Sequence, residues 1–331
     1  MSEPRAAVLA VDGGNSKTDL ALVSRAGALL ALVHGPTISH QQVPIQAAMD
    51  RLAGFVEQAR ADGGVKGPIE IGSFCLAGAD FASDVRLLRD AIGAEQVAKR
   101  VEVRNDAFAA LRAGSPSGWG VVVICGAGVN AVGVGPSGRE ARLAGIGDLS
   151  GDWGGGHAVG QAALAAAVRA RDGRGAQTSL TAIVPRELGL RRPIDVTRAM
   201  YDGRMSRRRL EELSPLVFAA AGEGDAVARA IVDRLADEVA VMATAIARRL
   251  RVASRDVDVV LTGGVFRTEE RGFYARIEER LLATLPHART RRLTERPVLG
   301  AALIGLDALG AARGGAAERR LRSAFAGAPL G

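Results

Sequence analysis

The stretch Val8-Leu9-Ala10-Val11-Asp12-Gly13-Gly14-Asn15-Ser16-Lys17-Thr18 joins an apolar run to a turn that holds two glycines and five polar side chains. The run predicts a buried strand, and a second strand follows over 18–24. Glycines let backbone N–H groups approach an anion closely, and the Lys17 ammonium suits a phosphate. Asp12 can hold Mg²⁺ through waters. The stretch predicts a phosphate-binding turn of a kind other than the Walker loop, with an ordinary hairpin turn as the alternative.

Two further apolar strands end in glycine turns, at 121–128 and at 257–264. Each half of the chain begins with a strand meander, and α/β units follow it. This weak repeat predicts two duplicated α/β halves that face a cleft. The breaker cluster at 114–118 marks the boundary. We therefore expect domains over 1–115 and 116–310, a helical insertion at about 172–225, and a loosely held tail over 311–331.

The apolar patterns within these halves predict most of the regular elements. Strands are expected at 7–11, 18–24, 28–33, 69–76, 101–103, 120–125, 130–134 and 257–261. Helices are expected at 45–60, 84–92, 106–113, 157–171, 226–250, 271–285 and 297–309. Residues 133–138 satisfy GxGxxG, but Pro136 and the lack of a following helix indicate a hairpin turn instead of a dinucleotide site.

The composition is that of a globular protein. Hydrophobic residues make up 48% and charged residues 24% of the 331 positions, and no apolar run approaches a membrane span. The first residues lack a signal-peptide core, and Cys75 and Cys125 form no CxxC pair, so a cytoplasmic location is expected. The net charge of +7 comes from short arginine clusters in the second half, and aromatics are only 4%. This pattern favours a solvated basic face over a nucleic-acid partner.

Two more segments carry groups that suit catalysis or binding. Asn105-Asp106 lies where a strand ends and a helix begins, so Asp106 is either a helix N-cap or a general base for phosphoryl transfer. The loop over 145–157 holds six glycines, two aspartates and Trp153. A flexible surface loop would not need the tryptophan, and a ligand-binding loop would use the carboxylates for sugar hydroxyls or Mg²⁺.

Taken in order, these motifs resemble a known family. The motifs are Asp12 to Thr18, Asn105-Asp106, Gly126-Ala127-Gly128-Val129-Asn130, Gly151-Asp152 and Leu261-Thr262-Gly263-Gly264-Val265. They are similar to the BadF/BadG/BcrA/BcrD ATPase family, which includes the N-acetylglucosamine kinases and has the actin/hexokinase/Hsp70 ATPase fold. The resemblance covers about residues 7–310. It implies an α/β fold of two RNase-H-like domains, with mixed five-stranded sheets flanked by helices, that close over ATP and Mg²⁺.

The resemblance also implies roles for individual residues. Asp106 would be the catalytic base and Asp12 the metal-binding residue. The ATP phosphates would lie on Gly13, Gly14, Asn15, Ser16, Lys17, Thr18, Gly126, Ala127 and Gly128. Gly263 and Gly264 would contact the adenosine. The sugar would lie among Ala77, Gly78, Asn105, Asp106, Asn130, Gly145 and Asp152. Ile146 and Trp153 replace a tryptophan and a glutamate that the kinases commonly carry, and residues 35–40 lack an expected asparagine, so these departures bear on substrate identity.

Three functions compete. The favoured one is an ATP-dependent kinase of an amino sugar such as N-acetylglucosamine or glucosamine, expected to be a homodimer without nucleic-acid or membrane partners. The alternative is an ATPase activator of a 2-hydroxyacyl-CoA dehydratase or benzoyl-CoA reductase, which needs paired cysteines for an iron–sulfur cluster. Cys75 and Cys125 lie in predicted strands and do not suit that role. A sugar-sensing repressor would need an added helix-turn-helix, whereas this chain starts its fold within ten residues.

Overall fold

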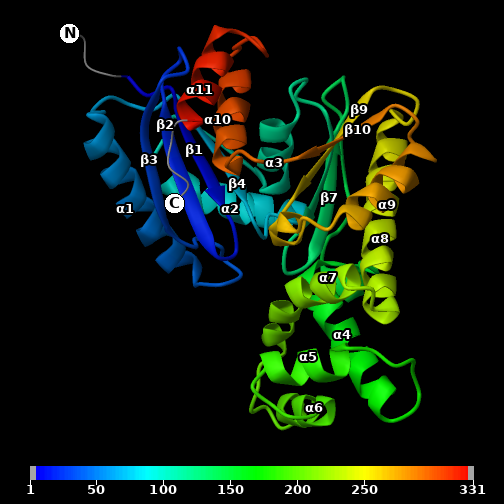
Figure 1. The fold of residues 1–331 in the computed structure, drawn as a ribbon. Coiled ribbons are helices and arrows are strands. Elements are labelled where there is room, and N and C mark those ends of the chain that lie inside the picture. The colour runs from blue at the N-terminus through cyan, green and yellow to red at the C-terminus, as the bar shows by residue number, and fades with distance from the viewer. Residues whose placement is uncertain (1–4, 327–331) are drawn as a thin grey trace. The chain divides into compact units, whose positions relative to one another are not determined.

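The structure is a computed structural model that describes residues 5–326. The chain forms two compact units, of which unit 1 comprises Met1–Val122, Pro136–Gly138 and Leu293–Gly331, and unit 2 comprises Val123–Gly135 and Arg139–Arg292. Each unit carries one five-stranded mixed sheet with helices against it (Figure 1). The predicted fold class is confirmed.

The sheet of unit 1 has the order β3-β2-β1-β4-β5. Its strands are β1 (Val8–Gly13), β2 (Lys17–Val23), β3 (Leu29–Pro36), β4 (Ile71–Leu76) and β5 (Arg100–Asn105). β1, β2 and β3 form an antiparallel meander, whereas β4 and β5 run parallel to β1. Gly13 lies opposite Leu76, and Leu76 lies opposite Asn105. The three parallel strands therefore end in one row, at the edge of the sheet where ligands bind in α/β proteins.

Helices cover both faces of this sheet. Leu9 and Val11 of β1 pack in one core cluster with α1 (Ile45–Gly63) and α2 (Ala82–Ala94). Val8 and Ala10 point to the other face, where a second cluster includes residues of α3 (Ala107–Gly114), α10 (Pro297–Ala308) and α11 (Ala316–Ala326). Since successive side chains of a strand alternate between faces, the part of β1 that packs in these two clusters must be apolar, and residues 8–11 are.

The sheet of unit 2 has the order β10-β9-β6-β7-β8. Its strands are β6 (Gly120–Cys125), β7 (Val129–Val134), β8 (Glu140–Arg142), β9 (Val257–Thr262) and β10 (Ala288–Arg292). β7 and β8 pair antiparallel around the turn at Pro136–Gly138, which confirms that the GxGxxG match is a hairpin turn. β10 was not predicted, because it is a short edge strand rich in arginine. Arg289 and Arg291 form ion pairs with Asp256 and Asp258 at 2.5 and 2.7 Å.

Helices make up most of the rest of unit 2. They are η1 (Gly147–Ser150), α4 (Gly155–Arg171), α5 (Leu180–Glu187), α6 (Pro193–Tyr201), η2 (Arg207–Leu213), α7 (Ser214–Gly222), α8 (Ala226–Leu250), η3 (Gly264–Arg267) and α9 (Arg271–Leu282). Asp225 caps α8 through Val227 N–H at 2.9 Å and accepts the Thr178 hydroxyl at 2.7 Å. Burial raises the pKa of Asp225, but these and neighbouring hydrogen bonds outweigh it and lower the pKa to about 2. Among residues 5–326, no helix is long and apolar enough to cross a membrane.

The boundaries of the two units differ from those of the expected domains. Residues 293–310 were assigned to the second domain, but α10 packs against α3 and β1 in unit 1. A Cβ at Gly300 would lie 1.8 Å from the Ala109 carbonyl oxygen, so α10 can pack this closely on α3 only because residue 300 is a glycine. The expected loose tail is wrong for residues 316–326, because α11 buries Leu321 and Phe325 against the sheet. Residues 327–331 of that tail lie outside the described part of the chain.

A buried ion network fastens this C-terminal segment to unit 1. Arg112 of α3 is 3% exposed and makes two hydrogen bonds each to Asp307 and Glu318, at 2.7–3.1 Å. Burial raises the pKa of Glu318, but the hydrogen bonds from Arg112 and the Gly314 amide outweigh it and lower the pKa to about 2. The network therefore joins α3 to both α10 and α11.

Arg112→Met should strongly destabilise unit 1, because it removes the buried cation that gives Glu318 and Asp307 two hydrogen bonds each. We expect a loss of about 3–5 kcal/mol in the free energy of unfolding, measured by urea denaturation followed by circular dichroism. Arg313→Met is the matched control, since Arg313 reaches the same Asp307 at 3.2 Å from an exposed position and should cost less than about 1 kcal/mol. Equal, small losses for both variants would contradict a structural role for the network.

Candidate active site

The predicted phosphate turn of unit 1 connects β1 to β2. Gly14 N–H donates to the Lys17 carbonyl at 2.9 Å, which closes the turn. The Thr37 hydroxyl donates to the Gly14 carbonyl at 2.7 Å, and the Thr18 hydroxyl accepts from Ile38 N–H at 3.1 Å. The segment after β3 thereby supports the turn from one side. The side chains at positions 15–17 are exposed, and Asn15 Oδ1 accepts from the Ser39 hydroxyl at 2.9 Å.

Three carboxylates gather beside this turn. Asp12 lies directly opposite Asp19 in the β1–β2 pairing. Burial raises the pKa of Asp12 well above its usual range, and the nearby carboxylates of Asp106 and Asp19 raise it further, while Lys17 acts in the opposite direction. Neighbouring like charges disfavour ionisation, and a cation would relieve their repulsion. This electrostatic environment fits a metal ion bound at Asp12, the residue that the sequence singled out.

Asp19 is a member of this group that the sequence analysis missed. Its side chain is 1% exposed and lies 2.6 Å from His34 Nδ1, with Lys17 and Arg296 each 3.9 Å away. The signal was present in the hairpin pattern, because residues 12 and 19 flank the turn symmetrically and point to the same face. Among residues 5–326, no three Asp, Glu, His or Cys side chains are placed to hold a metal together. A single carboxylate such as Asp12 can hold a cation that keeps most of its waters.

Asn105 and Asp106 follow β5 at the same edge of the sheet. The Asn105 side-chain oxygen accepts from Ala107 N–H at 3.1 Å, and its amide donates to Asp80 at 3.0 Å. The carboxylate of Asp106 accepts no hydrogen bond from the first turn of α3. The N-cap interpretation of Asp106 is therefore wrong, since Asn105 satisfies that helix end. The Asp106 carboxylate instead lies near enough to Asp12 to raise its pKa.

Ala77 and Gly78 follow β4 and complete this edge. Ala77 N–H donates to the Gly13 carbonyl at 2.7 Å, and Asp106 N–H donates to the Leu76 carbonyl at 3.3 Å. These bonds continue the parallel ladder past the strand ends. The structure thus brings together all the site residues predicted in unit 1. They are Asp12, Gly13, Gly14, Asn15, Ser16, Lys17, Thr18, Ala77, Gly78, Asn105 and Asp106.

The second predicted phosphate turn joins β6 to β7 in unit 2. Gly126 N–H donates to the Gly128 carbonyl at 2.9 Å. The Gly126 carbonyl accepts from Gly156 N–H at 2.7 Å, and the Ala127 carbonyl accepts from His157 N–H at 3.0 Å, so the start of α4 is tied to this turn. Gly155 has φ +78°, and a Cβ there would lie 2.4 Å from the Ala127 carbonyl oxygen. The run Gly154-Gly155-Gly156 in the sequence could have predicted that the start of α4 packs closely on this turn.

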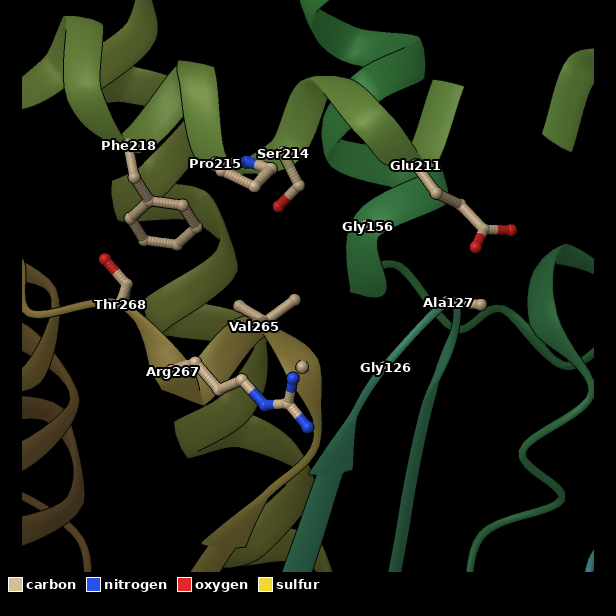
Figure 2. A pocket seen from close by; sticks show the side chains of 11 residues that line it. Gly126, Ala127, Gly156, Glu211, Ser214, Pro215, Phe218, Val265, Arg267 and Thr268 are labelled. Carbon is tan, nitrogen blue, oxygen red and sulfur yellow. The ribbon is translucent and has the colours of Figure 1, made fainter. Parts of the chain in front are cut away.

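A pocket of about 530 Å³ adjoins this turn within unit 2 (Figure 2). This volume lies in the range of small-molecule sites. Of the predicted residues it includes Gly126, Ala127 and Gly264, whereas Gly263 packs on the Cys125 backbone at φ +107° and holds the following residues in place. Sequence reasoning missed the other lining residues, which are Gly156, Glu211, Ser214, Pro215, Phe218, Val265, Arg267 and Thr268.

The sugar-binding residues predicted in unit 2 lie on β7 and on the loop that precedes α4. A Cβ at Gly145 would lie 2.5 Å from Asn130 Oδ1, so these two residues are in contact. The Ser150 hydroxyl donates to the Asp152 carboxylate, and Asp152 N–H donates to the Gly147 carbonyl at 3.0 Å. Trp153 turns to Arg234 of α8, whose guanidinium lies 3.9 Å from the ring centroid. The tryptophan therefore has a packing role in this unit.

The two cysteines are free and buried in the sheets. Burial raises the pKa of the Cys75 thiol above its usual range and that of the Cys125 thiol to about 12. An iron–sulfur cluster needs exposed, deprotonated cysteine ligands from paired positions. The activator alternative is therefore not favoured.

Comparison with known proteins agrees with this geometry. The model of the BadF/BadG/BcrA/BcrD ATPase family matches residues 9–305. The chain is 28% identical to N-acetyl-D-glucosamine kinase of Dictyostelium discoideum over 314 residues, which is 90% of this chain and 97% of that protein. It is 29% identical to N-acetylmuramic acid/N-acetylglucosamine kinase of Clostridium acetobutylicum over 269 residues, which is 78% of this chain and 85% of that protein.

Solved structures show the same fold. A protein of Chromobacterium violaceum assigned as an N-acetylglucosamine kinase aligns with a TM-score of 0.66 at 23% identity, over 90% of this chain and 98% of its own. A ROK family glucokinase of Streptomyces griseus, in complex with glucose and AMPPNP, aligns with a TM-score of 0.55 at 20% identity, over 93% of this chain and 99% of its own. These likenesses establish the two-domain actin-like fold.

The capping arrangement makes a prediction about stability. Asn105→Ala should lower the free energy of unfolding by about 1–2 kcal/mol, because it removes the cap of α3 and the bond to Asp80. Asp106→Asn should change it by less than about 1 kcal/mol, since that side chain caps nothing. Urea denaturation of both variants measures these losses. A larger loss for Asp106→Asn than for Asn105→Ala would show that Asp106 is the N-cap after all.

Proposed function

We propose that this protein, which belongs to the BadF/BadG/BcrA/BcrD ATPase family, phosphorylates an amino sugar such as N-acetylglucosamine or glucosamine with ATP as donor. Kinases of N-acetylglucosamine are its relatives over most of the chain. The observation that carries the proposal is the position of Asp106, which follows β5 at the edge where β1, β4 and β5 end and whose carboxylate lies near enough to Asp12 to raise the pKa of Asp12. A general base and a metal-binding carboxylate at one edge are what phosphoryl transfer to an alcohol requires.

Each unit, taken by itself, offers groups that suit part of a nucleotide. In unit 2, the pocket of about 530 Å³ would take the nucleoside, and the backbone of Gly126, Ala127 and Gly128 would take phosphate oxygens. In unit 1, Ser16, Lys17 and the turn amides would contact phosphates. Asp12 would hold Mg²⁺, mostly through waters. When bound, this ion supplies positive charge that offsets the charge on the phosphates.

Asp106 would act on the sugar hydroxyl. Its carboxylate takes the hydroxyl proton as the sugar oxygen forms a bond to the γ-phosphorus, and the bond from that phosphorus to the leaving ADP oxygen breaks. The products are a sugar phosphate and ADP, and the proton leaves from Asp106 to water. A positioned base typically contributes about 10²–10⁴-fold to the rate.

The substrate class rests on the relatives and on the sugar-loop residues. The resemblance to these kinases assigns sugar contacts to Asn105 in unit 1 and, separately, to Asn130, Gly145 and Asp152 in unit 2. Ile146 and Trp153 differ from the residues common in these kinases, so the preferred amino sugar is best found by an ADP-release screen over hexoses, amino sugars and N-acetyl sugars. A homodimer stays a prediction, which sedimentation can test.

Asp106→Asn should lower kcat by about 10²–10⁴-fold, because asparagine keeps the shape but cannot accept the proton. The affinity for ADP should change little, since the nucleotide pocket lies in unit 2. Coupled ADP-release assays and calorimetry check the two quantities. Asp90→Asn, an exposed position on α2, is the control for removing a carboxylate. A kcat near that of the unmodified protein would remove Asp106 as the base.

Asp12→Asn should abolish the Mg²⁺ dependence of nucleotide binding. In the unmodified protein, ADP with Mg²⁺ should raise Tm more than ADP alone, because the ion joins the nucleotide to Asp12. In the variant the two increments should be equal. Asp62→Asn, at the exposed end of α1, should behave as the unmodified protein does. A persistent Mg²⁺ increment in Asp12→Asn would place the metal elsewhere.

A further inference from the structure

A second pocket of unit 2 lies on the face of α4 opposite the pocket at the phosphate turn. Its volume is about 590 Å³, which is in the range of small-molecule sites. Among residues 5–326, the two pockets share no lining residue. Gly156 lines the first pocket and Ala158 the second, and residues two apart on a helix lie about 200° apart around its axis. The second pocket is therefore a separate site, and its lining also includes Trp153, Gln161, Ala162, Ala165 and Arg234.

Arg234 of α8 is the available cation of this pocket. Its guanidinium carbon lies 3.9 Å from the centroid of the Trp153 ring. Within residues 5–326, the Arg234 side chain has no hydrogen bond or ion pair, and no acidic residue lines the pocket. The N–H donors of a guanidinium lie in the plane of the group, so stacking on a ring leaves them free at its edge. Trp153 thus holds Arg234 in place, and the donors remain available to an oxyanion.

The α4 side of the pocket offers apolar surface and one free amide. Ala158, Ala162 and Ala165 line it with methyl groups, and Gln161 lies among them. The exposed Gln161 side chain has no hydrogen bond to another residue in the range 5–326. An amide both donates to and accepts from hydroxyls, and methyl groups suit the C–H face of a sugar ring. This side of the pocket therefore suits a ring that carries hydroxyls.

The far end of the pocket is less suited to an anion. Arg169 lies about three turns after Ala158, or about 16 Å further along α4. Its guanidinium donates to the Arg174 carbonyl at 2.9 Å, and Arg174 forms an ion pair with Asp172 at 2.7 Å. An anionic group of a ligand is therefore better placed at Arg234. A free phosphate would leave most of the volume of about 590 Å³ unfilled, whereas a sugar phosphate supplies both an oxyanion and a hydroxylated ring.

We propose that this pocket is a second binding site, for phosphorylated sugars, in which Arg234 pairs with the phosphate and Gln161 with ring hydroxyls. The ligand class rests on the proposed function, because the proposed reaction yields a sugar phosphate, whereas the pocket lies apart from the proposed nucleotide site. Trp153 directly follows Asp152, and a Cβ at Gly154 would lie 3.2 Å from Leu235 Cδ1. α8 thus contacts two consecutive residues of the sugar loop, and binding at Arg234 should alter the surroundings of the Trp153 ring.

Calorimetric titration with N-acetylglucosamine present in excess tests the site, because that sugar fills the proposed sugar site and leaves the second site to the titrant. The titrants are glucosamine 6-phosphate, N-acetylglucosamine 6-phosphate and inorganic phosphate. The unmodified protein should bind at least one sugar phosphate about tenfold or more tightly than inorganic phosphate, since the ring adds contacts. Arg234→Met should weaken this binding by about tenfold or more, because a charge-assisted pair is lost.

Two further variants sharpen the test. Arg248→Met is the matched control, since Arg248 is an exposed arginine of the same helix outside this pocket, and it should bind as the unmodified protein does. Arg234→Lys keeps the charge but lacks the planar set of donors, so it should still weaken binding by about threefold or more. In a Trp119→Phe background, Trp153 is the remaining tryptophan, and its fluorescence should change in proportion to the bound sugar phosphate.

Four results would overturn the proposal. They are no binding of either sugar phosphate to the unmodified protein, equal binding to Arg234→Met and Arg248→Met, unchanged Trp153 fluorescence at saturation, and equal affinity for inorganic phosphate, which would indicate an adventitious ion only. The proposed function fails differently. A lack of sugar binding and turnover would reject the kinase proposal, while an affinity for a sugar phosphate that depends on Arg234 would still support the second site.

Discussion

The meeting of three carboxylates at one sheet edge is the constraint on which unit 1 depends. Asp12 and Asp19 face each other across a β hairpin, and Asp106 lies close enough to raise the pKa of Asp12 further. Such an arrangement is unfavourable on its own, and Lys17 opposes it at Asp12, while Lys17, His34 and Arg296 lie 2.6–3.9 Å from the Asp19 carboxylate. A bound cation would offset this negative charge, which is the reason for the metal site proposed at Asp12.

The rest of unit 1 holds that edge rigid. β1 is buried on both faces, so the strand that ends in Asp12 is fixed by two core clusters. α3 begins directly after Asp106, and its Arg112 is held by Asp307 and Glu318. The last helices of the chain therefore support the helix that follows the proposed base. Such support keeps a catalytic carboxylate in position without any contact to the ligand.

Unit 2 achieves the same rigidity through glycine. Its phosphate turn, the start of α4 and the turn after β9 approach one another so closely that a Cβ at Gly155 or Gly263 would lie 2.4 Å from a backbone oxygen. The amides of α4 are used to hold the turn, and the wall of η2 and α7 follows from the packing of η2 on α4. The pocket in unit 2 thus has one end lined by the backbone of the turn after β6, which would suit phosphate groups, and one apolar end, which would suit a nucleobase.

The sequence by itself determined the features that depend on neighbouring residues. The Asp12 to Thr18 turn, the glycine turns after β6 and β9, and the strand-to-helix junction at Asn105-Asp106 are local patterns of apolar runs, glycine and polar groups, and their order identified the family. Only the tertiary structure decided what depends on distant contacts. It placed Glu211 and Phe218 in one pocket with Gly126, returned α10 and α11 to unit 1, and assigned the cap of α3 to Asn105. Asn105 and Asp106 each have a side-chain oxygen that could cap α3. The pairing of β4 with β5 fixes the backbone at this point and so decides which of the two does, and a pairing between distant strands cannot be read from a local sequence pattern.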